Sequence, residues 1–177
     1  NAAGIDKIPS TWDELVSACK TIQEKTPDVT AFLQDWGNPH YGSLNEIFWP
    51  YFWGAGGEIV DEEGNLTIDS AEGLAATEYL YSLKKDGILT DSCTSCDDVL
   101  EPFKNGEAAM VVMASSNALT ATNVNWDFQP LIQGPKESKT FVAADSLVMF
   151  EKCSNKELAA KLMKYITSAE VMSDFHK

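Results

Sequence analysis

Aromatic side chains in loop-like sequence are the residues whose types and spacing most suggest a chemical role. Trp36 and Tyr41 lie in the segment 34–43 among Gly, Asn, Pro and Ser residues. A sugar ring packs its C–H groups on aromatic faces, and its hydroxyls need short polar neighbours. Short polar side chains also follow an apolar run, at Ser115, Ser116 and Asn117. The two segments are therefore candidate contacts for a sugar-like ligand.

The remaining aromatic residues have a structural alternative. Trp49 and Trp53 lie one helical turn apart, and that spacing is more typical of a core than of a binding site. We expect Trp53 in the core, whereas Trp49 suits the core and a ligand contact equally. Trp126 is interpreted as a structural residue that leads into a strand, and His40 as a loop histidine with an ordinary hydrogen bond.

Catalytic motifs are missing from this sequence. It contains no GxSxG, HExxH or GxxxxGK[ST] pattern, and no GxGxxG pattern after a predicted strand. Two histidines are too few for most metal or triad schemes. Carboxylates are abundant, so their number leaves a glycosidase-type pair open, but their positions match helix caps and exposed helix faces. We expect a protein that is not an enzyme.

The four cysteines do not indicate a metal centre. Cys93 and Cys96 have CxxC spacing, while Cys19 and Cys153 lie far away in the sequence. One CxxC pair supplies only two of the four ligands that a tetrahedral zinc site needs. Inert thiols or a local disulfide are the favoured interpretation, with adventitious metal binding and a redox role as alternatives. We expect no metal and no cofactor.

Charge and composition exclude several classes of partner. The chain has 177 residues, 44% of them hydrophobic, and a net charge of −14. This composition is typical of a globular domain, and the charge argues against nucleic acid and anionic membrane surfaces. No stretch approaches the roughly 20 apolar residues of a membrane helix. The opening Asn1-Ala2 is similar to the remnant of an expression tag, so residues 1–3 are interpreted as a tag remnant and lead-in.

Helical and strand-like patterns alternate along the chain, which predicts an α/β fold with a mixed sheet. Capping residues and apolar periodicity predict the helices, and short apolar runs predict the strands. A hairpin is expected around Gly64, within residues 58–69. The predicted helices span 11–25, 44–53, 70–86, 97–104 and 155–166, with a last one from 168 onward; the predicted strands span 29–33, 108–113, 127–132 and 141–150.

Six stretches in this order resemble the family-1 extracellular solute-binding proteins, the group that includes maltose-binding protein. The most recognisable is Phe103-Lys104-Asn105-Gly106-Glu107-Ala108-Ala109-Met110, a helix end that runs into a buried strand. Each stretch is weakly specific, but together they cover nearly the whole chain at the family's spacing. The other five stretches are residues 8–15, 56–61, 67–73, 141–147 and 155–170.

The resemblance implies a fold of two α/β lobes joined by crossing strands, with the ligand in the cleft. This chain resembles only the middle of that architecture. Residues 4–127 correspond to the second lobe and residues 128–177 to a returning segment of the first. We therefore expect a type II periplasmic-binding-protein-like lobe with a mixed sheet flanked by helices, in an incomplete two-lobe architecture.

The resemblance also implies where a ligand binds. Family members contact ligand after the strand that ends near Leu33 and at the start of the next helix, which nominates Trp36, Tyr41, Glu46 and Trp49. They also contact ligand after the buried strand, which here means Ser115, Ser116 and Asn117. Asp145 is a candidate acceptor for sugar hydroxyls. Many sugar binders have a stacking tryptophan where this chain has Ser116, which argues against long maltodextrins.

The function implied is that of the substrate-binding component of an ABC importer, with a carbohydrate as ligand and a membrane permease as partner. Its place would be extracellular, as a cell-surface lipoprotein or in the periplasm. The alternatives are a binder of a non-sugar solute (a peptide, a polyamine or a phosphate ester), a carbohydrate-active enzyme, or a signalling or adhesive module. A cationic ligand would need several carboxylates at the site, and an anionic one would need cations or a helix N-terminus.

Overall fold

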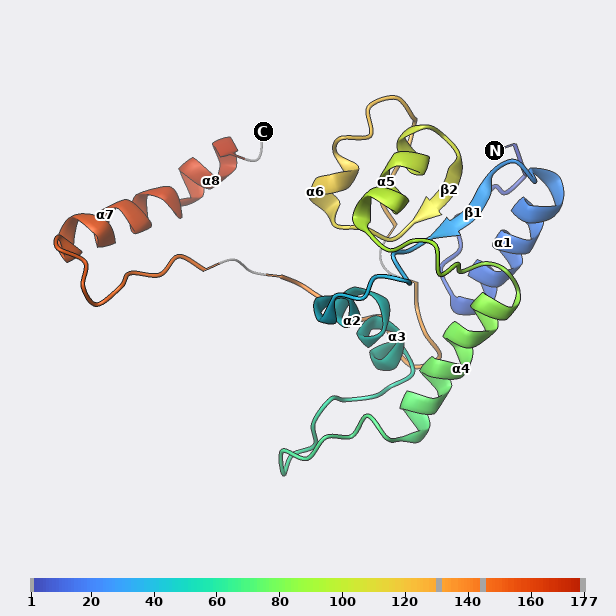
Figure 1. Ribbon diagram of the computed structural model, residues 1–177, viewed down its shortest axis with the longest axis horizontal. Helices are drawn as coiled ribbons and strands as arrows, with labels where there is room; N and C mark the ends of the chain where they lie inside the picture. Colours follow the sequence, from blue (N-terminus) through green and yellow to red (C-terminus); the bar gives the residue numbers. More distant parts are fainter. Residues whose placement is uncertain (1, 130–131, 144–145, 176–177) are drawn as a thin grey trace. The chain divides into compact units, whose positions relative to one another are not determined.

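The computed structural model describes residues 2–129, 132–143 and 146–175, and the side chain of Tyr41 lies outside that description. Contacts divide the chain into two units, Asn1–Phe141 and Val142–Lys177. Figure 1 shows the elements of each. The boundary falls C-terminal to the one expected after residue 127, and which lobe each unit belongs to stays a prediction.

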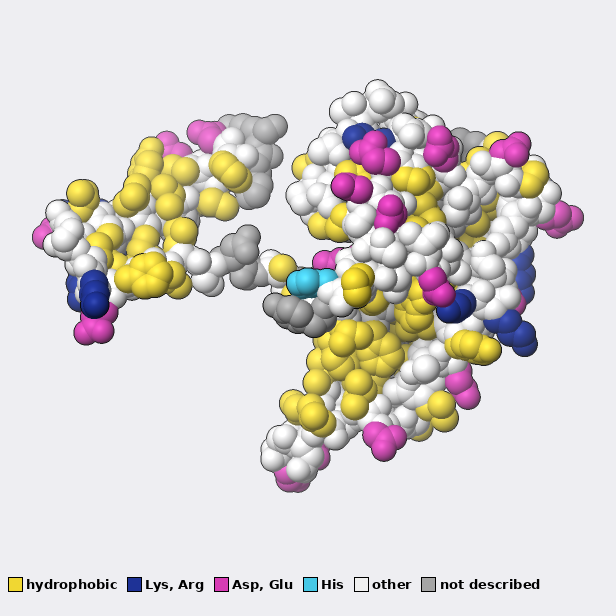
Figure 2. All heavy atoms as spheres, in the orientation of Figure 1, with side chains coloured by type: hydrophobic (Ala, Val, Ile, Leu, Met, Phe, Trp, Pro, Cys, Tyr) yellow, Lys and Arg dark blue, Asp and Glu magenta, His cyan; other side chains and the backbone are white. Residues whose placement is uncertain are grey.

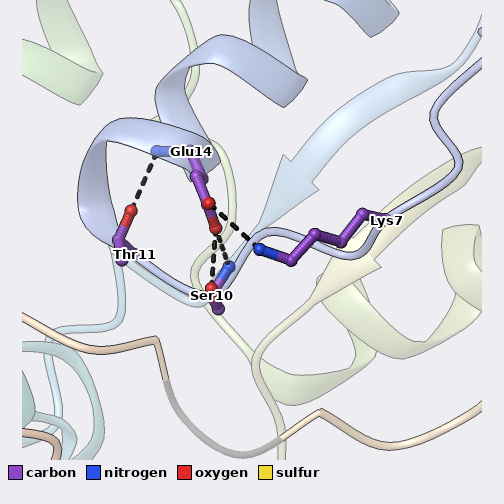
Figure 3. A network of polar contacts seen from close by, with 4 residues as sticks. All are labelled: Lys7, Ser10, Thr11 and Glu14. Atoms are coloured by element: carbon purple, nitrogen blue, oxygen red, sulfur yellow. Dashed lines mark hydrogen bonds and ion pairs between the residues drawn. The ribbon is translucent and has the colours of Figure 1, made fainter.

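The first helix, α1 (Trp12–Lys25), begins at a network of polar contacts (Figure 3). The Thr11 hydroxyl accepts a hydrogen bond from the Glu14 backbone N–H at 3.3 Å. The Glu14 carboxylate accepts from the backbone N–H and the hydroxyl of Ser10, both at 2.7 Å, and pairs with Lys7 at 3.2 Å. These contacts satisfy donors that a helix start leaves free. The helix predicted over 11–25 is confirmed.

In the described residues the sheet has two parallel strands, β1 (Thr30–Leu33) and β2 (Ala108–Val111), which lie side by side in Figure 1. Leu33 is paired with Val111, and the Val112 N–H donates to the Leu33 carbonyl at 3.0 Å. Parallel strands end at the same edge of a sheet. The segments that follow β1 and β2 therefore both start from one edge.

The helix predicted over 44–53 is interrupted, which corrects the sequence analysis. A 3-10 turn, η1 (Tyr41–Ser43), leads into α2 (Leu44–Ile47), and α3 (Trp49–Gly54) follows after Phe48. Pro50 explains the break, because it has no backbone N–H and its ring disfavours a preceding helical turn. The break makes Trp49 the first residue of a helix instead of a mid-helix residue.

The main core lies where α1, α3 and α4 (Ala71–Lys85) meet. The cap of α4 is Ser70, one residue after the predicted Asp69, and its hydroxyl accepts from the Gly73 N–H. Tyr79 of α4 stacks on Trp12 with ring centroids 4.1 Å apart. The core residues buried from these helices include Leu15, Cys19, Ile22, Tyr51, Phe52, Ala76, Leu80 and Leu83.

A smaller core lies under α5 (Cys96–Lys104), where Leu33, Cys93, Val99 and Ala108 pack together. Ser95 and Asp98 form a capping box at the start of α5. The next helix after β2 is the short α6 (Ser115–Ala118). The small core thus joins α5 and the segment before it to the ends of both strands.

Two predicted strands are wrong in the part of the chain that is described. Residues 127–129 and 132 form no strand; nearby, Gln133 makes one isolated bridge with Thr11. Residues 141–143 and 146–150 form none either, and Val148 and Phe150 are 72% and 79% exposed. An apolar run becomes a strand only when another strand accepts its backbone hydrogen bonds. The hairpin predicted around Gly64 is represented by one antiparallel bridge, Val60 to Leu66.

The second unit contains α7 (Lys156–Ile166) and α8 (Ala169–Phe175), as the capping pattern predicts. The Asn155 side chain caps α7 through the Leu158 N–H. Neither helix has a buried residue, so the apolar stripe of α7 is open, with Leu158, Leu162 and Tyr165 all exposed. In the described ranges, no helix has the length and apolar character to cross a membrane.

Candidate functional site

The candidate site begins with Gln34, the first residue after β1. Its side chain is 1% exposed and makes two hydrogen bonds. Its Nε2 donates to the Glu46 carbonyl at 3.0 Å, and its Oε1 accepts from the Tyr51 hydroxyl at 3.1 Å. This one amide therefore ties the end of the strand to α2 and α3, and it places the starts of both helices beside the strand edge.

Asp35 follows, with a side chain that is only 6% exposed. Its Oδ2 accepts from Asn38 Nδ2 at 2.9 Å, and the Asn38 N–H donates to the Asp35 carbonyl at 3.0 Å. No ion pair involves Asp35 among the described residues. A carboxylate buried to this extent without a cation is a strong hydrogen-bond acceptor for a ligand's hydroxyl or amino group.

Glu46 adds a second carboxylate from the exposed side of α2. Partial burial, and after it the negative charge of Asp35, raises the pKa of the Glu46 carboxyl above its usual value. The geometric link between the two residues is Gln34, which precedes Asp35 in the chain and donates to the Glu46 carbonyl. The site is consequently rich in acceptors.

Trp36 and Trp49 are both half-buried, and both pack against the main core. The Trp49 ring meets Phe48 and Phe52 edge to face, with centroids 5.3 and 5.8 Å away. Part of each tryptophan is therefore structural and part is open to a ligand. Figure 2 shows hydrophobic side chains gathered over α3 on the face in view. Trp53 also packs against the core, as its spacing predicted.

A third segment, residues 91–96, lies against the loop that carries Asp35 and Trp36. The Gly37 N–H donates to the Cys93 carbonyl at 2.8 Å. A Cβ atom on Gly37 would overlap the Asp91 carbonyl oxygen, so only glycine permits this approach. Cys93 is buried and Cys96 exposed; both are free thiols. Burial first, and nearby carboxylates after it, raise the pKa of both thiols, which disfavours the thiolate form that reacts.

The remaining predicted residues are less closely tied to this group. Ser115 and Ser116 are exposed and Asn117 is half-buried, on α6 after β2. Their described hydrogen bonds are local, and none joins them to the segment 34–49. Both segments, 34–49 and 115–117, follow the edge of the sheet at which β1 and β2 end. Tyr41 opens the 3-10 turn η1, and Asp145 lies outside the described residues.

The structure ties Glu46 to the end of β1 through Gln34 and packs both Trp36 and Trp49 against the main core. It adds three polar residues that sequence reasoning did not select: Gln34, Asp35 and Asn38. A signal was present, because Gln34 and Asp35 come directly after an apolar strand. Ligands of open α/β sheets bind outside the carboxyl ends of the strands. Two consecutive polar residues at that position therefore indicate a ligand site.

Chemically, this group of residues offers acceptors and partly open aromatic faces. The described residues contain no cluster of three or more His, Cys, Asp or Glu side chains that could hold a metal ion. The carboxylates Asp35 and Glu46 accept hydrogen bonds from hydroxyl or amino groups, while Trp36 and Trp49 offer surfaces for C–H groups. The arrangement is suited to holding a polar solute with apolar faces.

Comparison with known families gives one match over almost the entire chain. Residues 1–173 match the family described as bacterial extracellular solute-binding protein. A Brucella abortus protein, named as a binding protein only provisionally, is 26% identical over 181 residues, which is 98% of this chain and 43% of that protein. The arabinooligosaccharide-binding protein of Halalkalibacterium halodurans is 32% identical over 83 residues, covering 46% of this chain and 17% of that one.

Solved structures share the fold. The maltose-bound MalE3 protein of T. maritima is 28% identical with a TM-score of 0.73, over 95% of this chain and 45% of that one. A solute-binding protein of Thermotoga lettingae bound to α-D-tagatose is 22% identical with a TM-score of 0.80, over 98% of this chain and 46% of that one. This chain therefore spans less than half the length of these proteins and has an incomplete form of their α/β fold.

Proposed function

The chain belongs to the bacterial extracellular solute-binding proteins, and on that premise we propose that it binds a carbohydrate and delivers it to an ABC importer. The observation that carries the proposal is the strand edge at which half-buried Trp36 follows buried Gln34 and Asp35, and at which Gln34 bonds Tyr51 of α3, the helix that half-buried Trp49 begins. Rings beside strong acceptors match the two kinds of surface that a sugar presents.

The ligands named for similar proteins support this substrate class. Maltose is bound in the T. maritima structure, and the Halalkalibacterium relative is named for arabino-oligosaccharides. The known ligands differ in size, and Ser116 stands where a bulky stacking ring would favour long chains. A short, hydroxyl-rich sugar is therefore the ligand that we expect.

The proposal includes a partner, a location and an assignment of the two units. The partner is the membrane permease of the importer. The location is the periplasm in two-membrane bacteria, or the outer cell surface as a lipoprotein in one-membrane bacteria. Residues 4–127 belong to the second lobe, and residues 128–177 return to the first. The open apolar stripe of α7 supports this assignment, since it needs a partner surface. The ligand is bound and released without chemical change.

A second candidate ligand, an amine-bearing solute, is favoured by the charges at the site. The chain contains no arginine, and between residues 26 and 103 its only lysines are Lys84 and Lys85. Asp35 and Glu46 carry no ion pair among the described residues. An amino sugar or polyamine would neutralise these carboxylates, whereas a sugar phosphate or uronate would meet repulsion.

The test is a thermal-shift panel on the intact protein. The panel contains maltose, D-tagatose, arabino-oligosaccharides, glucosamine, spermidine, a sugar phosphate and short peptides. A ligand at a hundred times its Kd stabilises the folded state by about 2.7 kcal/mol, which raises the Tm by about 5 °C or more. A shift with neutral sugars alone supports the carbohydrate proposal. A shift with spermidine or peptides alone replaces it.

Trp36→Ala locates the site. Removing the ring should abolish most of the ligand-induced shift in Tm, because it takes away one of the two half-buried rings on which a sugar could stack. Tyr81→Ala is the matched control, since Tyr81 is a 65% exposed ring on α4 outside the site. A Trp36→Ala protein that keeps the full shift would move the site away from the strand edge.

A further inference from the structure

Residues 132–139, which we name the clasp, join the start of α1 to the end of α3. On one side, the Gln133 N–H donates to the Ser10 carbonyl at 2.9 Å, and the Trp12 N–H donates to the Gln133 carbonyl at 3.3 Å. These bonds form the isolated parallel bridge between Thr11 and Gln133. One end of the clasp is therefore attached at the polar network that begins α1 (Figure 3).

On the other side, the clasp holds the last residue of α3. The N–H groups of Lys136 and Glu137 both donate to the Gly54 carbonyl, at 3.0 and 3.3 Å. The Gly134 N–H donates to the Glu137 carbonyl at 2.9 Å and closes a turn around this contact. Beyond the turn, Lys139 pairs with Glu58 at 2.9 Å. The carbonyl at the C-terminal end of α3, which a helix leaves free, is thereby satisfied.

Two glycines make this approach possible. A Cβ atom on Gly134 would lie 2.6 Å from the Gly54 Cα and would overlap the Gly54 carbonyl oxygen. A Cβ atom on Gly54 would lie 3.3 Å from the Gly134 Cα and 3.4 Å from the Trp12 ring. Any side chain at Gly134 must therefore push the clasp and α3 apart, by about 1 Å if ordinary contact distances are restored. Such an approach of two backbones is a position where only glycine fits.

A short, continuous set of contacts runs from the clasp to the candidate ligand site. Helix α3 has six residues, so Gly54 at its end and Trp49 at its start are separated by about 8 Å. In the same helix, the Tyr51 hydroxyl donates to Gln34, which lies at the strand edge of the site. A displacement of α3 at Gly54 thus reaches both Trp49 and Gln34 through packed groups.

We propose that Gly134 is a positioning residue for the ligand site: the clasp sets the place of α3, and α3 sets the places of Trp49 and Gln34. The role rests on the proposed function, because it concerns the geometry of that site. It is indirect, since Gly134 contacts the end of α3 that lies away from Trp49. Without the clasp, the end of α3 would lose the contacts that fix its position.

The first test needs no ligand. The five tryptophans, Trp12, Trp36, Trp49, Trp53 and Trp126, are replaced by fluorotryptophan, and each 19F resonance is assigned from a single Trp→Phe variant. In Gly134→Ala, the resonances of Trp49 and of Trp36, which lies two residues after Gln34, should move while that of Trp126 stays in place. Trp12 and Trp53 lie next to Gly54, so their resonances would shift whether or not the rest of α3 moves, and they do not test the inference. Unchanged Trp36 and Trp49 resonances would overturn the inference.

The second test measures affinity with whichever of maltose, D-tagatose, arabino-oligosaccharide, glucosamine or spermidine the wild-type protein binds. Gly134→Ala should bind it about tenfold more weakly, as expected for loss of one well-placed polar contact. Lys139→Gln, which removes the ion pairs of the clasp but keeps the glycine contact, should bind like wild type. Equal affinities for Gly134→Ala and wild type would contradict the positioning role.

Two further outcomes have to be distinguished: a Gly134→Ala variant that does not fold, and a wild-type protein that binds none of the probes. If Gly134→Ala does not fold, Gly54→Ala decides: a Cβ atom on Gly54 would lie 3.3 Å from the Gly134 Cα, a milder contact that should shift the same two resonances by less. If the wild-type protein binds none of the probes, the proposed function fails, while the 19F experiment still tests whether the clasp positions Trp36 and Trp49.

Discussion

At the scale of single residues, the site depends on two polar side chains that a protein rarely buries without reason. Gln34 has both ends of its amide satisfied, by the Glu46 carbonyl and the Tyr51 hydroxyl. One oxygen of the Asp35 carboxylate accepts a hydrogen bond from Asn38, and among the described residues no cationic side chain forms an ion pair with it. Gln34 therefore ties together the parts of the candidate site, and we expect Asp35 to be its strongest acceptor for a ligand.

Asp35→Asn tests the acceptor role. The side chain keeps its shape, but the hydrogen bond to a ligand loses its charge, so affinity for a neutral sugar should fall about tenfold and affinity for an amine more. The measurement is isothermal titration with the ligand found in the panel. Asp28→Asn serves as the control, because it removes the same charge from an exposed turn before the opposite end of β1. Equal losses in both variants would show a general charge effect and no contact at Asp35.

At the scale of elements, caps and proline decide where helices begin and end. Helix α1 starts where Glu14 binds Ser10, and α3 starts afresh because Pro50 interrupts the preceding turn. These local devices matter for the site as well: the proline places Trp49 at a helix start, and the polar network of α1 is the anchor of the clasp. Local sequence therefore acts on the site through the ends of helices.

The start of α1 should make stability depend on pH. Hydrogen bonds from Ser10, and after them Lys7, lower the pKa of Glu14 from its ordinary 4.5 to about 2. A carboxyl with a lowered pKa in the folded state contributes stability above the unfolded value, and that contribution is lost as the pH falls through the folded one. The Tm difference between wild type and Glu14→Gln should therefore be full at pH 6 and shrink between about pH 4.5 and 2.

Differential scanning calorimetry at several pH values measures this difference. Glu24→Gln, an exposed change on the same helix, controls for the loss of one negative charge and should lower the Tm by less at pH 6. A Glu14→Gln protein whose Tm difference from wild type stays constant down to pH 2 would show that the network does not stabilise the helix start.

At the scale of the whole molecule, the acidic residues are spread over the surface, as Figure 2 shows for the face in view, and the core is concentrated in the first unit. The second unit has helices without buried residues. Because the chain spans less than half the length of its relatives, these helices are where we expect the rest of a two-lobed protein to pack.

Hydrogen exchange tests this expectation. Amides of α7 should exchange rapidly in the 177-residue chain, since no buried contact holds the helix closed, and slowly in a protein of the relatives' full length. Amides of α4, which buries Ala76, Leu80 and Leu83, are the internal reference and should be protected in both. Equal exchange of α7 in the two proteins would remove the support for assigning residues 142–177 to another lobe.

Much of the fold could be predicted from the sequence. The helices α1, α4, α5 and α7 follow from caps and apolar periodicity, because both signals are local, and the order of motifs identified the family. The strands predicted over 127–132 and 141–150 were wrong in their described residues, because a strand exists only with a partner and sequence does not name the partner.

The candidate site, too, could be predicted from the sequence only in part. Sequence and resemblance pointed to Trp36, Glu46 and Trp49, since residue type and position after a strand are local properties. Only the tertiary structure showed that Asp35 is buried, that Gln34 joins the strand to α3, and that Gly134 meets Gly54 from 80 residues away. Burial and contact across the chain depend on packing, which no single stretch of sequence encodes.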